Sequence, residues 1–240
     1  MISSFDRSPQ RFVRMAGFFY LAIIALGLFG EVFVRGALVV SGDAAATAQR
    51  IVESPQLWRM GIAGDLLMHV FDLPVIVVLY LLLRPVSKPL ALFTAFINVV
   101  QTAVLALNKL NLVLPILLLS GGGTLKTFAP EQLQSLAYLA INVHSFGFGI
   151  GLIFFGVACL VRGYLIFKSG FLPNTLGVLL ALAGVSYLIN SFALILAPAL
   201  ASALFPYVLI PAFVGELALA LWMIFKGLDL TAWARRSVRD

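Results

Sequence analysis

The sequence is poor in cysteine and in charge. It has a single cysteine, Cys159, so an internal disulfide and a thiolate metal cluster are both excluded. Only 11% of the residues are charged, compared with roughly 25% in an average soluble domain, and 62% are hydrophobic. A water-soluble chain of this composition could not cover its surface with polar groups. Lipid is therefore expected to be the solvent for most of the chain.

The positive net charge does not indicate a nucleic-acid-binding protein. The formal charge is +6, but the basic residues sit in short turns between apolar runs. This is the pattern of topology signals in membrane proteins. The glycine run 121–123 also lacks the Lys-Ser/Thr ending of a phosphate-binding loop. The composition thus favours the lipid bilayer as a partner and gives no reason to expect nucleic acid.

Six apolar runs are long enough to cross roughly 30 Å of hydrocarbon as helices. They cover residues 15–40, 57–83, 90–119, 133–161, 172–197 and 204–225. The sequence therefore predicts an all-α fold, with residues 1–240 forming a single six-helix transmembrane domain. The Ala-rich segment 43–55 is predicted to form a short surface helix between the first two spans.

Lysine and arginine predict the orientation of these spans. One side of the membrane would carry Arg7, Arg11, Arg14, Arg84, Lys88, Arg162, Lys168, Lys226, Arg235, Arg236 and Arg239. The more basic side is cytoplasmic by the positive-inside rule. We therefore expect a multi-pass protein of the plasma membrane (the bacterial inner membrane), with both termini cytoplasmic. Arg162 is assigned in this scheme to the turn after the fourth span.

Ionisable and amide side chains interrupt the apolar spans at a common depth, nearer the outer face. Such groups are costly in lipid, which makes each of them a functional candidate. The predicted pocket residues are Glu31, Asp65, His69, Asp72, Asn108, Lys109, His144, Asn190 and Glu216. One shared, carboxylate-rich cavity in the outer half of the membrane explains their common depth more simply than scattered tolerance does.

Helical spacing adds detail to this prediction. Asp65, His69 and Asp72 fall on a single stripe at about 100° per residue. Asn142 and His144 point to nearly opposite faces, and we favour His144 for the pocket because glycines on its face permit close helix packing. Lys109 lies too deep to remain charged alone, so it needs a carboxylate, with Asp65 or Asp72 as the expected partner.

Several short motifs resemble a known family. GYL at 163–165, SGFLP at 169–173 and LGVLL at 176–180 are similar to a bacterial multi-pass membrane family called domain of unknown function 4386. The opening RMAG at 14–17 and the segment 79–86 resemble it too. These are mostly turn and packing residues, so the resemblance implies fold and topology over nearly the whole chain. The family has no settled activity, and His144 is the candidate site residue within the matching block.

Four functions stay open at this point. The favoured one is binding or transport of a small solute, a cation or a lipid-like amphiphile. A second is a metal-dependent hydrolase that holds a divalent ion on Asp65, His69 and His144 and activates water. Hydrolases of the ceramidase and adiponectin-receptor type use three histidines and seven spans, whereas this chain has two histidines and six predicted spans.

The other two functions use the same residues differently. His69 and His144 could be the axial ligands of one haem in a redox protein, since two histidines suffice. Alternatively, the polar residues form a structural network that binds no ligand. The sequence does not decide between an enzyme and a non-enzyme, and it carries no signal for the oligomeric state.

Overall fold

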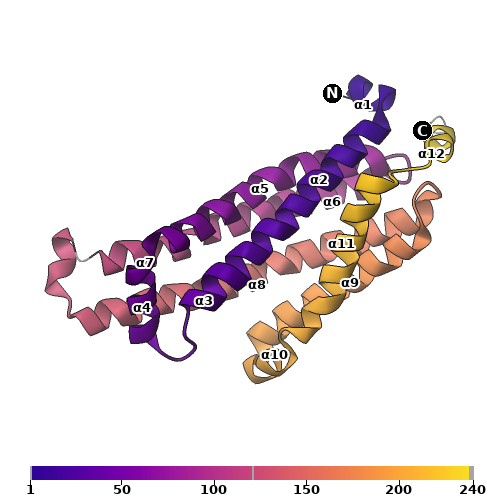
Figure 1. The fold of residues 1–240 in the computed structure, drawn as a ribbon. Helices are drawn as coiled ribbons and strands as arrows, with labels where there is room; N and C mark the ends of the chain where they lie inside the picture. Colours follow the sequence, from indigo (N-terminus) through magenta and orange to yellow (C-terminus); the bar gives the residue numbers. More distant parts are fainter. Residues whose placement is uncertain (1, 121, 238–240) are drawn as a thin grey trace. The chain divides into compact units, whose positions relative to one another are not determined.

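The computed structural model describes residues 2–120 and 122–237, and within these ranges every regular element is helical (Figure 1). Six helices in the described part are long and apolar enough to cross a membrane. They are Pro9–Leu38, Pro55–Leu83, Lys88–Leu119, Pro130–Ser169, Asn174–Leu196 and Tyr207–Phe225. The predicted all-α, six-span fold is confirmed.

The first span is not a uniform helix. It follows α1 (Ile2–Arg7) and consists of α2 (Pro9–Leu28), a π-helical segment η1 (Phe29–Arg35) and α3 (Gly36–Leu38). The wider turn is seen where the Gly36 N–H donates to the Glu31 carbonyl, five residues earlier in the chain. Single π-turns are rare and are found frequently at functional sites.

The next two spans are α5 (Pro55–Leu83) and a broken pair, α6 (Lys88–Asn108) and α7 (Leu110–Leu119). The break falls at Lys109, whose N–H bonds to the Ala106 carbonyl, three residues back. The predicted surface helix is present as α4 (Ala44–Glu53), and Asp43 caps its start by accepting from the Ala46 N–H at 2.8 Å.

A short 3-10 helix, η2 (Gly123–Thr127), precedes the fourth span, α8 (Pro130–Ser169). α8 ends at Gly170, which adopts a positive φ of 74° that favours glycine. The assignment of Arg162 to a turn was wrong, because α8 contains no proline after Pro130 and continues past this arginine to Ser169. The remaining elements are α9 (Asn174–Leu196), α10 (Pro198–Leu204), η3 (Tyr207–Leu209), α11 (Ile210–Phe225) and α12 (Leu230–Ser237).

The chain forms two compact units, and the division falls inside α2, α5, α6 and α8. The first unit contains Met1–Ile23, Phe71–Ala103 and Gly149–Asp240. The second unit contains Ile24–Val70 and Val104–Phe148. The second has an apolar core, formed by Val34, Leu38, Ile51, Trp58, Ile62, Leu112 and Ile141.

Glycines bring the helices of the first unit into backbone contact. A Cβ atom on Gly163 would lie 2.6 Å from the Gly177 carbonyl oxygen, and one on Gly184 would lie 2.6 Å from that of Gly156. α8 and α9 therefore pack without side chains between them at these points. Small residues at helix contacts are the usual device in lipid, where apolar side chains gain little by associating.

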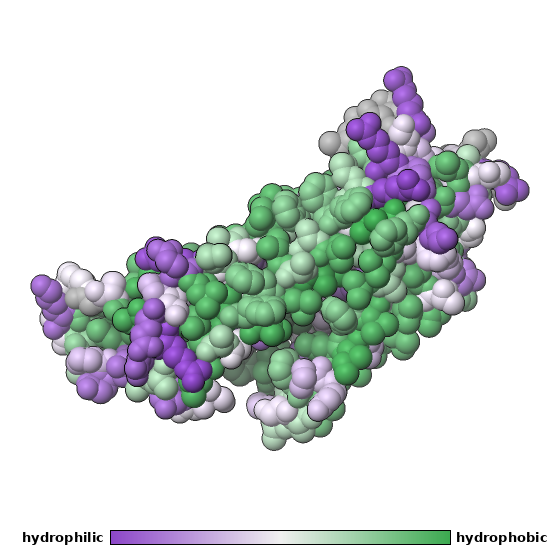
Figure 2. Space-filling view, viewed as in Figure 1, coloured by the Kyte–Doolittle hydropathy of each residue, from purple (hydrophilic) through white to green (hydrophobic). Residues whose placement is uncertain are grey.

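The outer surface of the helices matches a lipid environment. Large apolar side chains are exposed along the spans, including Phe18, Phe33, Phe96 and Leu107, each more than 60% exposed. Figure 2 shows apolar residues over the visible sides of the long helices, with hydrophilic residues gathered near α1, α4 and α12. Lipid is the partner that this surface fits.

Candidate functional site

An ion cluster lies in the second unit. Arg35 Nη1 donates to Asp65 Oδ2 at 2.8 Å, and Lys109 Nζ donates to the same oxygen at 3.0 Å. Arg35 Nε also donates to Glu31 Oε2 at 2.8 Å. The cluster thus joins the first, second and third spans through one aspartate. The expected carboxylate partner of Lys109 is confirmed, and it is Asp65.

The charges of this cluster are unequally buried. The side chains of Asp65, Lys109 and Arg35 are 1%, 3% and 14% exposed, whereas that of Glu31 is 60% exposed. The buried part therefore holds two cations and one carboxylate. Glu31, whose side chain is largely exposed, provides the second negative charge of the cluster.

Local backbone features bring these side chains together. A Cβ atom on Gly30 would lie 2.5 Å from Asp65 Oδ1 and 3.0 Å from Arg35 Nη2, so only glycine lets η1 approach the aspartate this closely. A Cβ atom on Gly61 would lie 2.8 Å from Val34 Cγ1, which shows the same close packing one turn away on α5.

A pair of amide and imidazole groups lies in the same unit. Asn108 Nδ2 donates to the His144 carbonyl at 2.9 Å and lies 3.0 Å from His144 Nδ1. Gly147 makes room for this contact, because a Cβ atom there would overlap Asn108. His144 is buried and Asn142 is exposed, so His144 is the one of the two that faces the interior of the unit, and its place in a pocket stays a prediction.

His69 is the least satisfied member of this group. Its side chain is buried, and its Nε2 atom has no hydrogen-bond partner among the described residues. The ring lies within electrostatic range of both Asp65 and Lys109. Its neighbour Asp65 likewise has one oxygen, Oδ1, without a hydrogen-bond donor in the described chain.

The remaining predicted pocket residues belong to the first unit. Asp72 Oδ2 accepts from Asn98 Nδ2 at 2.9 Å and from the Thr102 hydroxyl. Glu216 accepts from the hydroxyls of two tyrosines, as described below. Asn190 in α9 is half-buried. The structure thus joins Glu31, Asp65 and Lys109 through Arg35, pairs Asn108 with His144, and assigns Asp72, Asn190 and Glu216 to the other unit.

Two arginines were absent from the predicted pocket. Arg35 is one helical turn after Glu31, and this spacing was the available signal for it. Arg162 is buried within α8, but an arginine close to the end of an apolar run carries the same pattern as a topology signal. Tyr20 and Tyr187 were also missed as carboxylate partners, because a tyrosine in an apolar span usually indicates packing.

No group of three or more His, Cys, Asp or Glu side chains is placed to hold a metal ion within the described ranges. Asp65, the first of the expected metal ligands, is already bonded to two cations. The metal set Asp65, His69 and His144 stays a prediction, and so does the haem coordinated by the two histidines.

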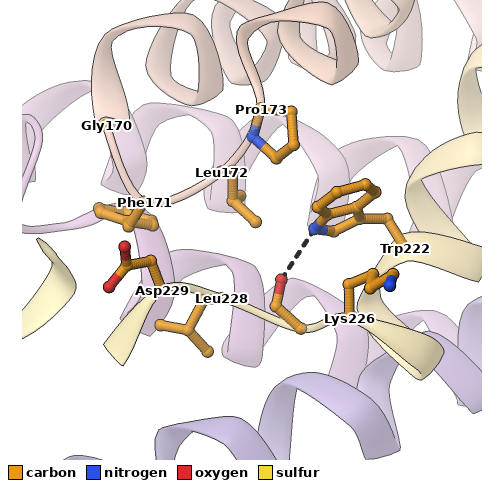
Figure 3. A pocket seen from close by; sticks show the side chains of 9 residues that line it. Gly170, Phe171, Leu172, Pro173, Trp222, Lys226, Leu228 and Asp229 are labelled. Atoms are coloured by element: carbon orange, nitrogen blue, oxygen red, sulfur yellow. Dashed lines mark hydrogen bonds between the residues drawn. The ribbon is translucent and has the colours of Figure 1, made fainter. Parts of the chain in front are cut away.

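Cavities lie at the ends of helices in both units. One, of about 410 Å³, lies in the first unit between the loop 170–173 and the segment from Trp222 to Asp229. Figure 3 shows Trp222 at its edge, with the indole N–H donating to the Gly227 carbonyl. The other, of about 760 Å³, lies in the second unit among α4, the end of α7 and the start of α8. Neither is lined by a predicted site residue.

Six membrane-crossing helices with charged side chains buried in their interior define a multi-pass integral membrane protein. The chain belongs to the family described as domain of unknown function (DUF4386), whose model matches residues 15–227. This confirms the family indicated by the sequence motifs. An uncharacterised protein from Archaeoglobus fulgidus is 28% identical over 171 residues, covering 71% of this chain and 85% of the relative. No solved structure matches the chain.

Proposed function

We propose that this protein binds a small anionic solute, or the anionic head group of an amphiphile, at the Arg35–Asp65–Lys109 cluster and carries it across the membrane. The observation behind the proposal is that two buried cations share a single carboxylate oxygen. In a site of low dielectric constant, such an arrangement favours the entry of a further anion.

The charge balance supports an anion over a cation. Without Glu31, the buried cluster carries a net charge of +1, and isolated charges are very costly away from water. Glu31 provides the compensating charge, but its side chain is already 60% exposed. An incoming carboxylate or phosphate can therefore replace it on Arg35 without moving a buried group into lipid.

The cluster also has hydrogen-bond donors to spare. A lysine ammonium has three N–H donors and an arginine guanidinium has five. Among the described residues, Lys109 bonds to Asp65 alone, and Arg35 bonds through Nε and Nη1. Free donors on two adjacent cations fit the oxygens of a carboxylate or phosphate, which form the stronger, charge-assisted type of hydrogen bond.

The backbone around the cluster supports movement as well as binding. The first span changes to a π-helix at Phe29–Arg35, and the third span breaks at Lys109. Both irregularities therefore fall on residues of the cluster. Interrupted helices at a buried ion site are a recurring feature of secondary transporters. Transport is for this reason preferred to static binding.

The proposal is tested by ligand binding to the purified, detergent-solubilised protein. A panel of small carboxylates, inorganic phosphate, short-chain phospholipids, neutral analogues and metal cations would be screened by thermal shift. Hits would then be measured by calorimetry. We expect anions to bind, and we expect Arg35→Gln and Lys109→Gln each to weaken binding at least tenfold. Soluble carboxylates and short-chain phospholipids distinguish a free solute from an amphiphile.

Arg59→Gln is the matched control, because Arg59 is an exposed arginine on the same helix as Asp65. It should leave binding unchanged. Binding of cations alone would overturn the proposal. So would anion binding equally strong in the Arg35 and Lys109 variants. A folded protein that binds nothing in the panel would favour the structural network instead.

A further inference from the structure

A second set of buried charged groups lies in the first unit and plays no part in the anion site. Its unusual member is Arg162 of α8, which is 3% exposed. The Nε and Nη2 atoms of Arg162 have no hydrogen-bond partner among the described residues. A buried guanidinium is expected to be paired with an opposite charge, so a carboxylate is expected near Arg162.

Those neighbours include two carboxyl groups. The Arg162 guanidinium lies within electrostatic range of Asp72 and Glu216. The titratable and charged groups that interact within this cluster are Tyr20 of α2, Asp72 of α5, Cys159 and Arg162 of α8, Tyr187 of α9 and Glu216 of α11. With both carboxyls ionised and one arginine present, the cluster would carry a net charge of −1.

The hydrogen bonds distinguish the two carboxyls. Glu216 uses both oxygens as acceptors, because Tyr20 donates to Oε2 at 3.1 Å and the Tyr187 hydroxyl donates to Oε1. Asp72 accepts both of its donors, Asn98 Nδ2 and the Thr102 hydroxyl, on Oδ2. Oδ1 of Asp72 thus has no hydrogen-bond donor within the described part of the chain, and it is the position at which a proton can be added without breaking a hydrogen bond.

We propose that Asp72 and Glu216 together form an intramembrane proton-binding site, in which Asp72 Oδ1 carries the proton and Arg162 balances the charge of Glu216. Binding forms one O–H bond on Asp72 while the hydronium ion that delivers the proton loses one and becomes water, and release reverses this step. The site goes beyond the anion-binding function and does not depend on it, since the two clusters share no residue.

Infrared spectroscopy of the intact protein in lipid tests the site directly, with the proton itself as the probe. The wild type should show a protonated carboxyl C=O band near neutral pH that shifts in D2O and disappears at alkaline pH. Asp72→Asn should abolish the band. Glu216→Gln should abolish it too, because the remaining carboxylate would then pair with Arg162.

Two further variants keep the proposal testable if either of those fails to fold. Arg162→Gln should strengthen the band, since neither carboxyl would retain a counter-charge. Thr102→Val should raise the band frequency, because the C=O at Asp72 Oδ2 loses a donor. Glu131→Gln, at an exposed carboxyl on α8, is the control and should leave the band unchanged.

The proposal is overturned if the wild type has no protonated carboxyl band near neutral pH. It is also overturned if the band persists in both Asp72→Asn and Glu216→Gln. An unchanged frequency in Thr102→Val would overturn the assignment of the proton to Asp72. A band that responds to sodium concentration at fixed pH would show a cation site instead.

Discussion

At the scale of single residues, the stability of the second unit is expected to depend on Lys109. Its ammonium group is 3% exposed and is bonded to Asp65 at 3.0 Å. Removing one member of a buried ion pair typically costs about 3–5 kcal/mol when the survivor is left charged and alone. Asp65 keeps its bond to Arg35, so we expect Lys109→Met to lower the free energy of unfolding by less than this, as measured by denaturant titration in detergent.

Double variants identify the partner. Adding Asp65→Asn to Lys109→Met should recover part of the lost stability, although Arg35 then keeps only Glu31. Adding Asp72→Asn should recover none, because Asp72 is bonded to Asn98 and Thr102 instead. If both double variants are equally stable, the pairing of Lys109 with Asp65 is not the source of the loss.

At the scale of helices, the close approach of η1 and α5 depends on Gly30. A Cβ atom there would lie 2.5 Å from Asp65 Oδ1, so Gly30→Ala must displace the aspartate or the helix. Overpacking of this kind costs about 1–3 kcal/mol. We expect a loss of stability in that range, together with weaker anion binding.

Gly64→Ala provides the matched comparison on α5. A Cβ atom at Gly64 would meet Leu26 Cδ2 at 3.6 Å and Phe29 Cδ1 at 3.8 Å, which are ordinary contacts. Alanine is also the better helix former, by up to about 1 kcal/mol. Gly64→Ala should be neutral or stabilising in the same unfolding assay. A loss as large as that of Gly30→Ala would refute the role given to Gly30.

A further contact between helices involves Trp58, whose indole N–H donates to the Leu112 carbonyl at 2.8 Å. Pro115, inside α7, lacks the N–H that would bond the carbonyl of Asn111, the residue before Leu112. Trp58 is buried, and Trp58→Phe should lower stability by about 1–3 kcal/mol because the Leu112 carbonyl loses its donor.

Trp222→Phe is the control for this change. Trp222 is half-buried, and its N–H donates to the Gly227 carbonyl at 3.0 Å. Water can replace that donor, so we expect a smaller loss of stability. Equal losses from the two substitutions would show that ring size, and not the hydrogen bond, accounts for the effect of Trp58→Phe.

At the scale of the whole molecule, the distribution of lysine and arginine predicts both termini in the cytoplasm and the glycine run near 122 outside the plasma membrane. A reporter active in the cytoplasm should be active when fused after residue 240, and one active outside should be active when inserted after Gly122. The opposite result at either position would contradict the predicted orientation.

The sequence predicts the spans well because long apolar runs have a direct physical consequence in lipid. It also predicts that Lys109 needs a carboxylate and that His144, not Asn142, is buried, since both follow from burial cost and helical spacing. It does not predict the π-helical turn at Phe29–Arg35, because regular spacing assumes one helix type throughout. The side chain of Glu31, which lies in that turn, is 60% exposed.

The sequence also does not predict which of Asp65 and Asp72 is the partner of Lys109. The two aspartates share one stripe of α5, so only the positions of neighbouring helices distinguish them. Arg162 was misassigned for a related reason. α8 extends past the hydrophobic run and buries Arg162, whereas Lys168 in its last turn is exposed, and composition alone places both in a turn.

The central claim, that the Arg35–Asp65–Lys109 cluster carries an anion across the membrane, is tested most directly by solid-supported membrane electrophysiology on proteoliposomes. Application of an anion that binds in the screen should produce a saturable current in the wild type and in Arg59→Gln. The current should be abolished in Lys109→Gln and Arg35→Gln. The claim would be contradicted if none of the anions that bind produced a current from the folded protein. It would also be contradicted if the current of Lys109→Gln equalled that of the wild type.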